Sequence, residues 1–335
     1  MFAATALSDD TEWVIQAVKF PRPSTPLIWK RYFRELSVLS TLVVLLAVLA
    51  VFAPHFFDAR PLLSRATAAA PHLLVTGGVA IVILCRQIDI SVGSVFGVCS
   101  VVAGLMASHG WSMAWAAGAS VALGALVGGL NGLLVAGLGL PSIVVTLATM
   151  VTVREALRLA QEGVFVNLPE GSQWLGMSMG VGQMGVCLAV VAIWLMLTAA
   201  LHWVAAGRFF YAVGSDAEAA RLAGLRPRST TFAAFVLVGA LTGVAAIFQL
   251  IQSPQVDPAI GRQLELEAIA AAVVGGVAIS GGRGNLGGVL VGFLLLNCIG
   301  PGLTYLGVKP HWDKAIQGSV ILLAVVADGL RRRPR

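Results

Sequence analysis

The sequence predicts an all-α polytopic membrane protein with about ten transmembrane helices and both termini in the cytoplasm. Three observations carry this prediction: the composition, the length of the apolar runs and the positions of the basic residues. Of 335 residues, 58% are hydrophobic, 11% are charged and 38 are glycine. Soluble domains carry about 25% charged residues, so this chain has too few polar side chains to coat a water-soluble globule. Lipid must therefore be its main solvent.

The apolar runs are close to the roughly 20 residues that a helix needs to cross the hydrocarbon core. The expected spans are 36–53, 66–86, 92–108, 111–137, 141–160, 182–203, 229–251, 265–281, 284–306 and 311–329. Glycines run through the join of the eighth and ninth. Residues 1–34 have several charges and no uninterrupted apolar core, so we expect no cleavable signal peptide.

The basic residues indicate how the spans are oriented. A net charge of +6 could suggest nucleic acid as a partner, but with ten spans 15 of the 22 Lys and Arg fall on one side. The positive-inside rule makes that side the cytoplasm. We therefore expect a membrane protein with both termini in the cytoplasm and with no nucleic-acid partner. Its predicted parts are a cytoplasmic tail (1–34), one transmembrane domain (35–330) that contains an inner loop (205–228), and a basic tail (331–335).

The cysteines and histidines give no support to metal chemistry. All four cysteines lie inside apolar runs, and neither Cys-x-x-Cys nor His-Glu-x-x-His occurs. Such cysteines behave as small buried hydrophobes. We expect no metal site and no disulfide framework.

Two glycine series predict close helix packing. Gly124, Gly128 and Gly132 recur every four residues in one span, and 284, 288 and 292 do so in another. Lipid gives helices no hydrophobic reason to associate, so small residues that let backbones approach are common at their interfaces.

Strongly polar groups inside spans are costly and are functional candidates by default. Asp89 and Ser91 lie at the join of two spans, where they could cap the helix that starts at Val92, line a pathway, or do both. Asn131 could bond across to another helix or contact a solute. Asn297, in the ninth span, is a further candidate.

One helix carries a stripe of hydroxyl groups. Ser142, Thr146 and Thr149 share one face of the fifth span, and such a stripe either bonds to its own backbone or lines a polar passage. Arg154 lies 13 residues beyond Pro141, about 20 Å along the axis, and is still at membrane depth. It is a candidate for a vestibule or an internal ion pair, whereas Arg158 is expected to reach the outer interface.

The sequence contains no motif that predicts catalysis. The chain has no Gly-x-x-x-x-Gly-Lys phosphate loop. The Gly-x-Gly-x-x-Gly letters at 282–287 lie between two spans, where a tight cytoplasmic turn is expected, and the Gly-x-Ser-x-Gly letters at 176–180 lie in an expected outer loop. We predict that the chain is not an enzyme.

The inner loop between the sixth and seventh spans predicts a short helix. Ser215 or Asp216 is a suitable N-cap, the residues at 217–222 are strong helix formers, and Gly224 is a stop. A capped two-turn helix is more than a connection needs, which favours a docking surface. The alternative is an ordinary connecting loop held by lipid headgroups.

Several motifs in order resemble the ribose-type permeases of ATP-binding-cassette sugar importers. They are Ile88–Gly93, Gly129–Gly132, Pro141–Leu147, Gly207–Gly224, Glu265–Ala271, Ile279–Gly284 and Ile316–Asp328. The residues at 149–174 look closest to the rhamnose and autoinducer-2 branch. One departure is that Arg86 and Gln87 stand where the family usually has two glycines, which affects any inference on fine specificity.

The resemblance implies partners. A second permease subunit, identical or related, would complete the path through the membrane lipid. Two cytoplasmic ATPase domains would bind the ATP and Mg²⁺, so this chain holds no cofactor, and an extracytoplasmic binding protein would deliver the sugar. The segment similar to the family's coupling helix contains Gly207, Arg208, Gly214, Asp216, Glu218, Ala219, Ala220, Arg221 and Gly224. The candidates for path lining are Asp89, Ser91, Asn131, Ser142, Thr146, Thr149 and Asn297.

The main alternative is an ion-coupled secondary transporter of a small polar solute. Such proteins need ionisable groups near the bilayer midplane and often have broken helices. Asp89 is the best acidic candidate, and the sequence places it near an inner boundary instead.

Overall fold

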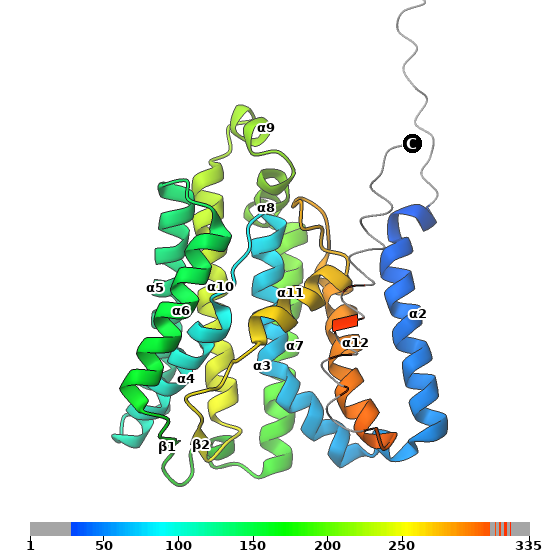
Figure 1. Ribbon diagram of the computed structural model, residues 1–335, viewed down its shortest axis with the longest axis vertical. Helices are drawn as coiled ribbons and strands as arrows, with labels where there is room; N and C mark the ends of the chain where they lie inside the picture. Colours follow the sequence, from blue (N-terminus) through cyan, green and yellow to red (C-terminus); the bar gives the residue numbers. More distant parts are fainter. Residues whose placement is uncertain (1–27, 309–311, 313–314, 316–317, 320–321, 323–335) are drawn as a thin grey trace, which may run out of the picture.

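The computed structural model describes residues 28–308 and, beyond them, residues 312, 315, 318, 319 and 322. This part is a helical bundle with one two-stranded ribbon, which confirms the all-α class (Figure 1). Its elements are α2 (Ile28–Phe52), η1 (Pro54–Phe57), α3 (Ala59–Leu84), α4 (Val92–Ser108), α5 (Met113–Gly132), η2 (Leu133–Gly137), α6 (Ser142–Gln161), β1 (Val166–Asn167), η3 (Gln173–Gly176), α7 (Met179–Trp203), α8 (Ala205–Ser215), α9 (Ala217–Leu222), α10 (Pro227–Leu250), β2 (Gln255–Val256), α11 (Leu264–Val274) and α12 (Leu286–Tyr305).

Five helical stretches of the described chain are long and apolar enough to cross a membrane: α3, α5 continued through η2, α7, α10 and α12. The apolar parts of α2 and α4 are shorter. Most of the expected span 311–329 and the whole basic tail lie outside the described residues. The number of ten spans and the cytoplasmic termini stay predictions.

The expected span 265–281 is wrong in its second half. The helix α11 has 11 residues and ends at Val274, so it is about 16 Å long and too short to cross alone. Residues 275–285 form a loop before α12, where a tight turn was expected. The cause is the backbone of this segment: Gly276, Gly281, Gly282 and Gly284 all have positive φ, which ends helical hydrogen bonding.

The first glycine series packs α5 on α10, as predicted. A Cβ at Gly124 would collide with the carbonyl oxygen of Gly239, and one at Gly128 would collide with that of Phe235. The second series is only partly helical. A Cβ at Gly292 would lie 2.5 Å from the Ala271 oxygen, so α12 packs on α11 there. However, Gly284 precedes α12 and belongs to the loop.

Two helical passages are interrupted inside the bundle. Residues 85–91, here the first break, lead from α3 to α4; residues 251–263, the second break, lead from α10 to α11. Figure 1 shows the first break running inward from the end that carries α8 and α9, and the second running inward from the end that carries β1 and β2. The helices α4 and α11 therefore start within the bundle, each at the end of an irregular segment.

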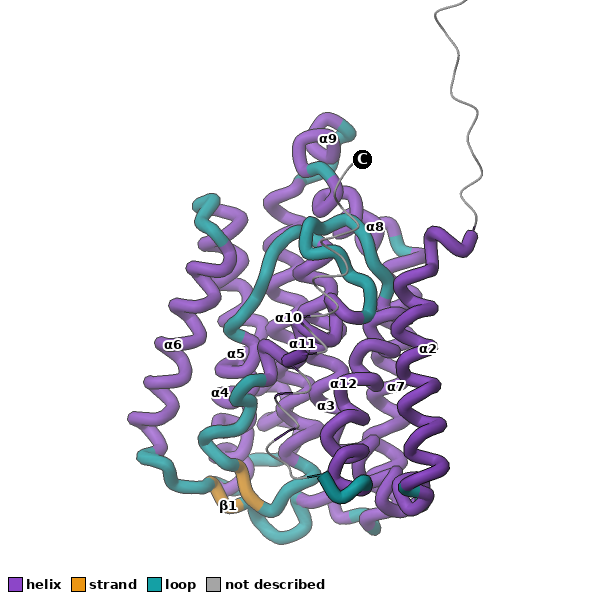
Figure 2. The backbone as a smooth tube through the Cα atoms, turned by 45° about the vertical axis from the view of Figure 1, so that its right-hand side comes forward, coloured by secondary structure: helices purple, strands orange, loops and turns teal. Residues whose placement is uncertain are grey.

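The strands β1 and β2 pair antiparallel, with Val166 opposite Val256. At the other end of the bundle, α8 and α9 project beyond the long helices, as both views show (Figures 1 and 2). The helix α8 is seated there by Gly214, where a Cβ would collide with the Leu84 carbonyl oxygen. The same oxygen accepts a hydrogen bond from the Gly282 N–H at 2.9 Å. The end of α3, the end of α8 and the 275–285 loop thus meet at one point.

Candidate functional site

The first break is closed by side chains that the sequence singled out. The Asp89 Oδ1 atom accepts hydrogen bonds from the Ser91 backbone N–H at 2.8 Å and from the Ser91 hydroxyl at 2.6 Å. Asp89 is 2% exposed and Ser91 is fully buried. Asp89 therefore closes a local turn onto Ser91, the N-cap residue of α4. Neither side chain accepts from an N–H group of α4, so the predicted side-chain cap of this helix is wrong.

The network continues into α5 and α6. The Asn131 amide donates to the Ser91 hydroxyl at 2.9 Å, and the Thr149 hydroxyl donates to the Asn131 Oδ1 atom at 2.6 Å. Asn131 is 1% exposed, so its bonds are made inside the protein. The expectation that Asn131 bonds across helices is confirmed.

The hydroxyl stripe of α6 holds the backbone of the first break. Ser142 Oγ accepts from the Ile88 N–H and Thr146 Oγ1 from the Ile90 N–H, each at 3.2 Å. Six of the seven predicted path residues thus form one hydrogen-bonded network that fastens the first break to α5 and α6. A path for solute beside this network stays a prediction.

The second break is fastened differently. Arg154, on α6, donates to the carbonyl oxygens of Ile260 at 3.2 Å and of Gly261 at 3.3 Å. The Gly261 oxygen and the Glu265 Oε2 atom both lie against Gly93 at the start of α4, where a Cβ would collide with either. Glu265 is 9% exposed, and its Oε2 atom is buried without a hydrogen-bond partner among the described residues. A buried carboxylate oxygen left in this way is costly.

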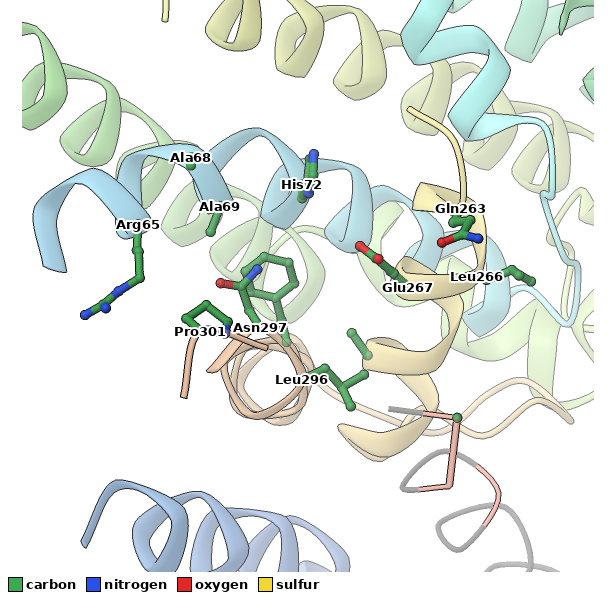
Figure 3. Close-up of a pocket in the computed structure, with 13 residues that line it drawn as sticks. Arg65, Ala68, Ala69, His72, Gln263, Leu266, Glu267, Leu296, Asn297 and Pro301 are labelled. Atoms are coloured by element: carbon green, nitrogen blue, oxygen red, sulfur yellow. The ribbon is translucent and has the colours of Figure 1, made fainter. Parts of the chain in front are cut away.

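The remaining predicted path residue, Asn297, lies in a cavity of about 530 Å³ between α3, α11 and α12. Arg65, His72, Gln263 and Glu267 also line this cavity. In Figure 3 the side chains of Asn297 and Glu267 lie on the same side of α3, whereas Arg65 extends away to the left and His72 points upward. Gly318, from the expected tenth span, also lines it.

Sequence reasoning missed most of these cavity residues, as well as Glu265. His72 and the two glutamates at 265 and 267 stand within apolar runs that were expected to be spans. That isolation was the available signal, because a polar group in a span is a functional candidate by default. The short length of α11, which brings Gln263 and Glu267 to mid-bundle, could not be foreseen from apolarity.

The predicted inner helix forms with the predicted boundaries. Asp216 Oδ1 accepts from the N–H groups of Glu218 at 2.9 Å and Ala219 at 3.0 Å, so Asp216 is the N-cap of α9. At the other end, Gly224 has a φ of +85° and donates to the Arg221 carbonyl oxygen at 3.0 Å. Positive φ explains why glycine suits this stop.

The surface of α9 is open. Glu218 and Arg221 form a bidentate pair, with Nη2 to Oε1 at 2.6 Å and Nε to Oε2 at 2.9 Å. This pair lowers the pKa of the Glu218 carboxyl and raises that of the Arg221 guanidinium. Leu222 is 76% exposed beside them, while Ala220 is buried and holds the helix to the bundle. The helix therefore presents Leu222 and the Glu218–Arg221 pair outward, together with the small exposed side chains of Ala217 and Ala219.

The other residues of this segment set its geometry. A Cβ at Gly207 would collide with the Ala200 carbonyl oxygen, so the chain turns tightly from α7 into α8. Arg208 donates to the carbonyl oxygens of His202 at 3.4 Å and Trp203 at 3.5 Å, which are at the end of α7. These contacts fix the turn from α7 into α8, the helix from which α9 continues at the end of the bundle.

Comparison with known proteins agrees with this arrangement. Residues 62–325 match the family described as branched-chain amino acid transport system / permease component. The chain belongs to this permease family. Members of it are multi-pass inner-membrane proteins, and this one has several helices able to span.

Individual permeases match nearly the whole chain. The autoinducer 2 import system permease protein LsrC of Enterobacter sp. (strain 638) is 35% identical over 90% of this chain and 88% of its own length. The ribose import permease protein RbsC of Escherichia coli (strain K12) is 31% identical over 90% of this chain and 96% of its own. The LsrC protein of Salmonella typhi is 34% identical over 89% and 86%. No solved structure matches the chain significantly.

Proposed function

We propose that the chain is the permease subunit of an ATP-binding-cassette importer that carries a sugar or sugar-like solute across the inner membrane. The permeases it is similar to import autoinducer 2 and ribose. In this proposal two permease subunits form the path, two ATPase domains dock on the inner face, and an extracytoplasmic protein delivers the solute. The ATPases bind ATP and Mg²⁺.

The observation that carries the proposal is the contact of α8, the helix that leads into α9, with the end of α3 and with the 275–285 loop. The helix α9 continues from α8, whose Gly214 lies against the Leu84 oxygen and against Gly282. Leu84 ends the helix before the first break, and Gly282 lies in the loop after α11. A force applied to α9 would therefore reach both interrupted passages through one contact point.

The mechanism follows from this geometry. ATP binding would draw the two ATPases together and move the α9 helices docked on them. That motion would shift α8 against α3 and the 275–285 loop, and so rock the bundle between two access states. Nucleotide drives the change to the extent that it binds the two states with different affinity.

Replacing Gly224 by proline tests the docking role. Proline fixes φ near −65° and has no N–H, so it cannot adopt the +85° of this stop or donate to Arg221. We expect Gly224→Pro to abolish transport-coupled ATP hydrolysis by the assembled transporter while the permease still folds. Hydrolysis that is unchanged by the substitution would contradict the docking role.

A second candidate function is an ion-coupled secondary transporter. The observation in its favour is the pair of interrupted helical passages, since broken helices are a feature of such proteins. An acidic residue lies near the start of the helix that follows each break: Asp89 before α4 and Glu265 in α11. Uptake into vesicles separates the two. Inhibition by vanadate with resistance to an uncoupler is the result that the ATP-driven proposal expects; the opposite pattern would establish the alternative.

A further inference from the structure

The cavity between α3, α11 and α12 is lined by charged, polar and apolar side chains. Arg65 and His72 come from α3, Gln263 and Glu267 from the start of α11, and Asn297 from α12. Figure 3 shows these residues on the three helices that surround the cavity, with Asn297 and Glu267 on the same side of α3. The apolar part includes the ring of Phe293 and the side chains of Leu266 and Leu296. Its volume of about 530 Å³ falls within the roughly 300–1,000 Å³ usual for small-molecule sites.

This lining suits a solute with several hydroxyl groups. A carboxylate only accepts hydrogen bonds, a guanidinium only donates, and an amide does both, so together they can satisfy hydroxyls that each donate and accept. The Asn297 amide makes no hydrogen bond within the described chain. The Phe293 ring offers a face for the C–H groups of a sugar. A purely apolar solute would bring no hydrogen-bonding partner to the Asn297 amide in a low-dielectric site.

Arg65 is held in place before any solute arrives. Its guanidinium donates to the Phe56 carbonyl oxygen and lies over the rings of Phe56, at 3.9 Å, and Tyr305, at 5.1 Å. Its Nη1 atom is buried with no partner among the described residues. The cation is therefore positioned at the edge of the cavity by contacts outside it.

The cavity lies in the half of the bundle away from α9. It is lined by the first turns of α3 and the last turns of α12, whereas the opposite ends of both helices lie near α8 (Figure 1). In the proposed orientation this is the half that faces the binding protein. Gln263 and Glu267 also place it directly beside the second break, the segment that Arg154 holds.

From the lining and its place we infer that this cavity within a single subunit is a holding site for the transported polyhydroxyl solute, with Glu267 and Asn297 binding its hydroxyl groups. The inference rests on the proposed function and adds the location of the solute. It separates binding from the Asp89 network, whose polar groups are already bonded to one another. Different residues then bind the solute and fasten the first break to α5 and α6.

Uptake by the whole transporter is the first test. Cells lacking their own uptake of these solutes would express the complete transporter and be offered a radiolabelled panel of pentoses, hexoses and autoinducer 2. For the solute taken up fastest, Glu267→Gln and Asn297→Leu should each raise the KM for uptake about five- to tenfold, the cost of one lost hydrogen bond to solute. Matched controls are Glu162→Gln, an exposed carboxylate at the end of α6, and Leu294→Ala, on the exposed face of α12.

The outcomes separate two failures. If the wild-type transporter takes up no member of the panel, both the proposed solute class and this inference are wrong. If it takes up a member and both cavity variants keep the wild-type KM, the location alone is wrong. Expression and thermal unfolding in detergent identify a variant that fails to fold, and labelling then decides the question.

Labelling by a charged, membrane-impermeant thiol reagent is that second test. Ala68→Cys and Asn297→Cys, both lining the cavity, should react at least tenfold faster than Leu188→Cys, on the exposed apolar face of α7. Saturating transported solute should slow the cavity reactions severalfold. Rates equal to that of Leu188→Cys, or rates that the solute leaves unchanged, would show a cavity filled by lipid or by protein and overturn the inference.

Discussion

The two breaks differ in how completely their polar groups are satisfied. At the first break, Asp89, Ser91 and Asn131 bond to one another at 0–2% exposure, and hydroxyls of α6 bond the adjoining backbone. At the second break, Glu265 leaves a buried oxygen without a partner among the described residues, and Gln263 has a φ of +68°. Backbone strain does not separate the two breaks, because Arg86 in the first break has a φ of +62°. The difference lies in the buried Glu265 oxygen, which has no counterpart in the Asp89 network.

This difference indicates which of the two breaks rearranges at the lower cost in free energy. A fully bonded buried network costs free energy to disturb, whereas a segment in which one buried carboxylate oxygen has no hydrogen-bond partner can gain one when it rearranges. The second break also adjoins the cavity through Gln263 and Glu267. We predict that the first break stays fixed and that the second break is the one that rearranges more easily.

The largest expected effect distinguishes the two carboxylates. Asp89→Ala removes the acceptor for the Ser91 N–H and hydroxyl and leaves both buried, so we expect a loss of about 3 kcal/mol in the free energy of unfolding. Glu265→Gln removes no hydrogen bond to Oε2, and we expect a change below about 0.5 kcal/mol. Thermal unfolding of both variants in the same detergent measures this; a larger loss for Glu265→Gln would reverse the comparison.

A smaller effect is expected where the two breaks touch. Gly93→Ala places a methyl group against both the Glu265 Oε2 atom and the Gly261 carbonyl oxygen, and we expect a loss of about 2 kcal/mol. Adding Glu265→Ala removes one of the two collisions, so the double variant should recover about half of that loss. Strictly additive losses would show that the two breaks do not meet at this point.

The smallest effect concerns the arginines of α6. Arg154→Met loses two hydrogen bonds to the carbonyls of the second break, at about 1–2 kcal/mol. Arg158→Met, its matched control one turn further on, loses only an exposed pair with Glu155 and should cost less than about 0.5 kcal/mol. Hydrogen exchange should also quicken at residues 257–263 in Arg154→Met alone. Equal effects of the two substitutions would mean that Arg154 does not hold the second break.

Local features were predictable from the sequence and contacts across the fold were not. The helix α9 forms with the expected bounds because its cap, its helix formers and its glycine stop act within a few residues of one another. The α5 glycines reveal a packing face by their spacing alone, although nothing in the sequence names Gly239 and Phe235 as the facing groups.

The errors have a common physical cause. Apolarity over 265–281 describes burial equally well whether the chain crosses the membrane or stops inside the bundle, so it could not show that α11 ends at Val274. Likewise, the polar groups of 88–91 and of α6 were candidates singly. That Ser142 and Thr146 turn toward the first break depends on how α6 packs, which involves residues more than 50 positions apart.

Transport by purified protein in sealed vesicles tests the central claim most directly. One preparation would hold this chain alone, and the other the chain with its ATPase partner and binding protein, with ATP inside or outside as the ATPase orientation requires. We predict uphill accumulation of sugar only in the complete assembly, only with ATP, and blocked by vanadate. Accumulation against a gradient by the chain alone would contradict the account.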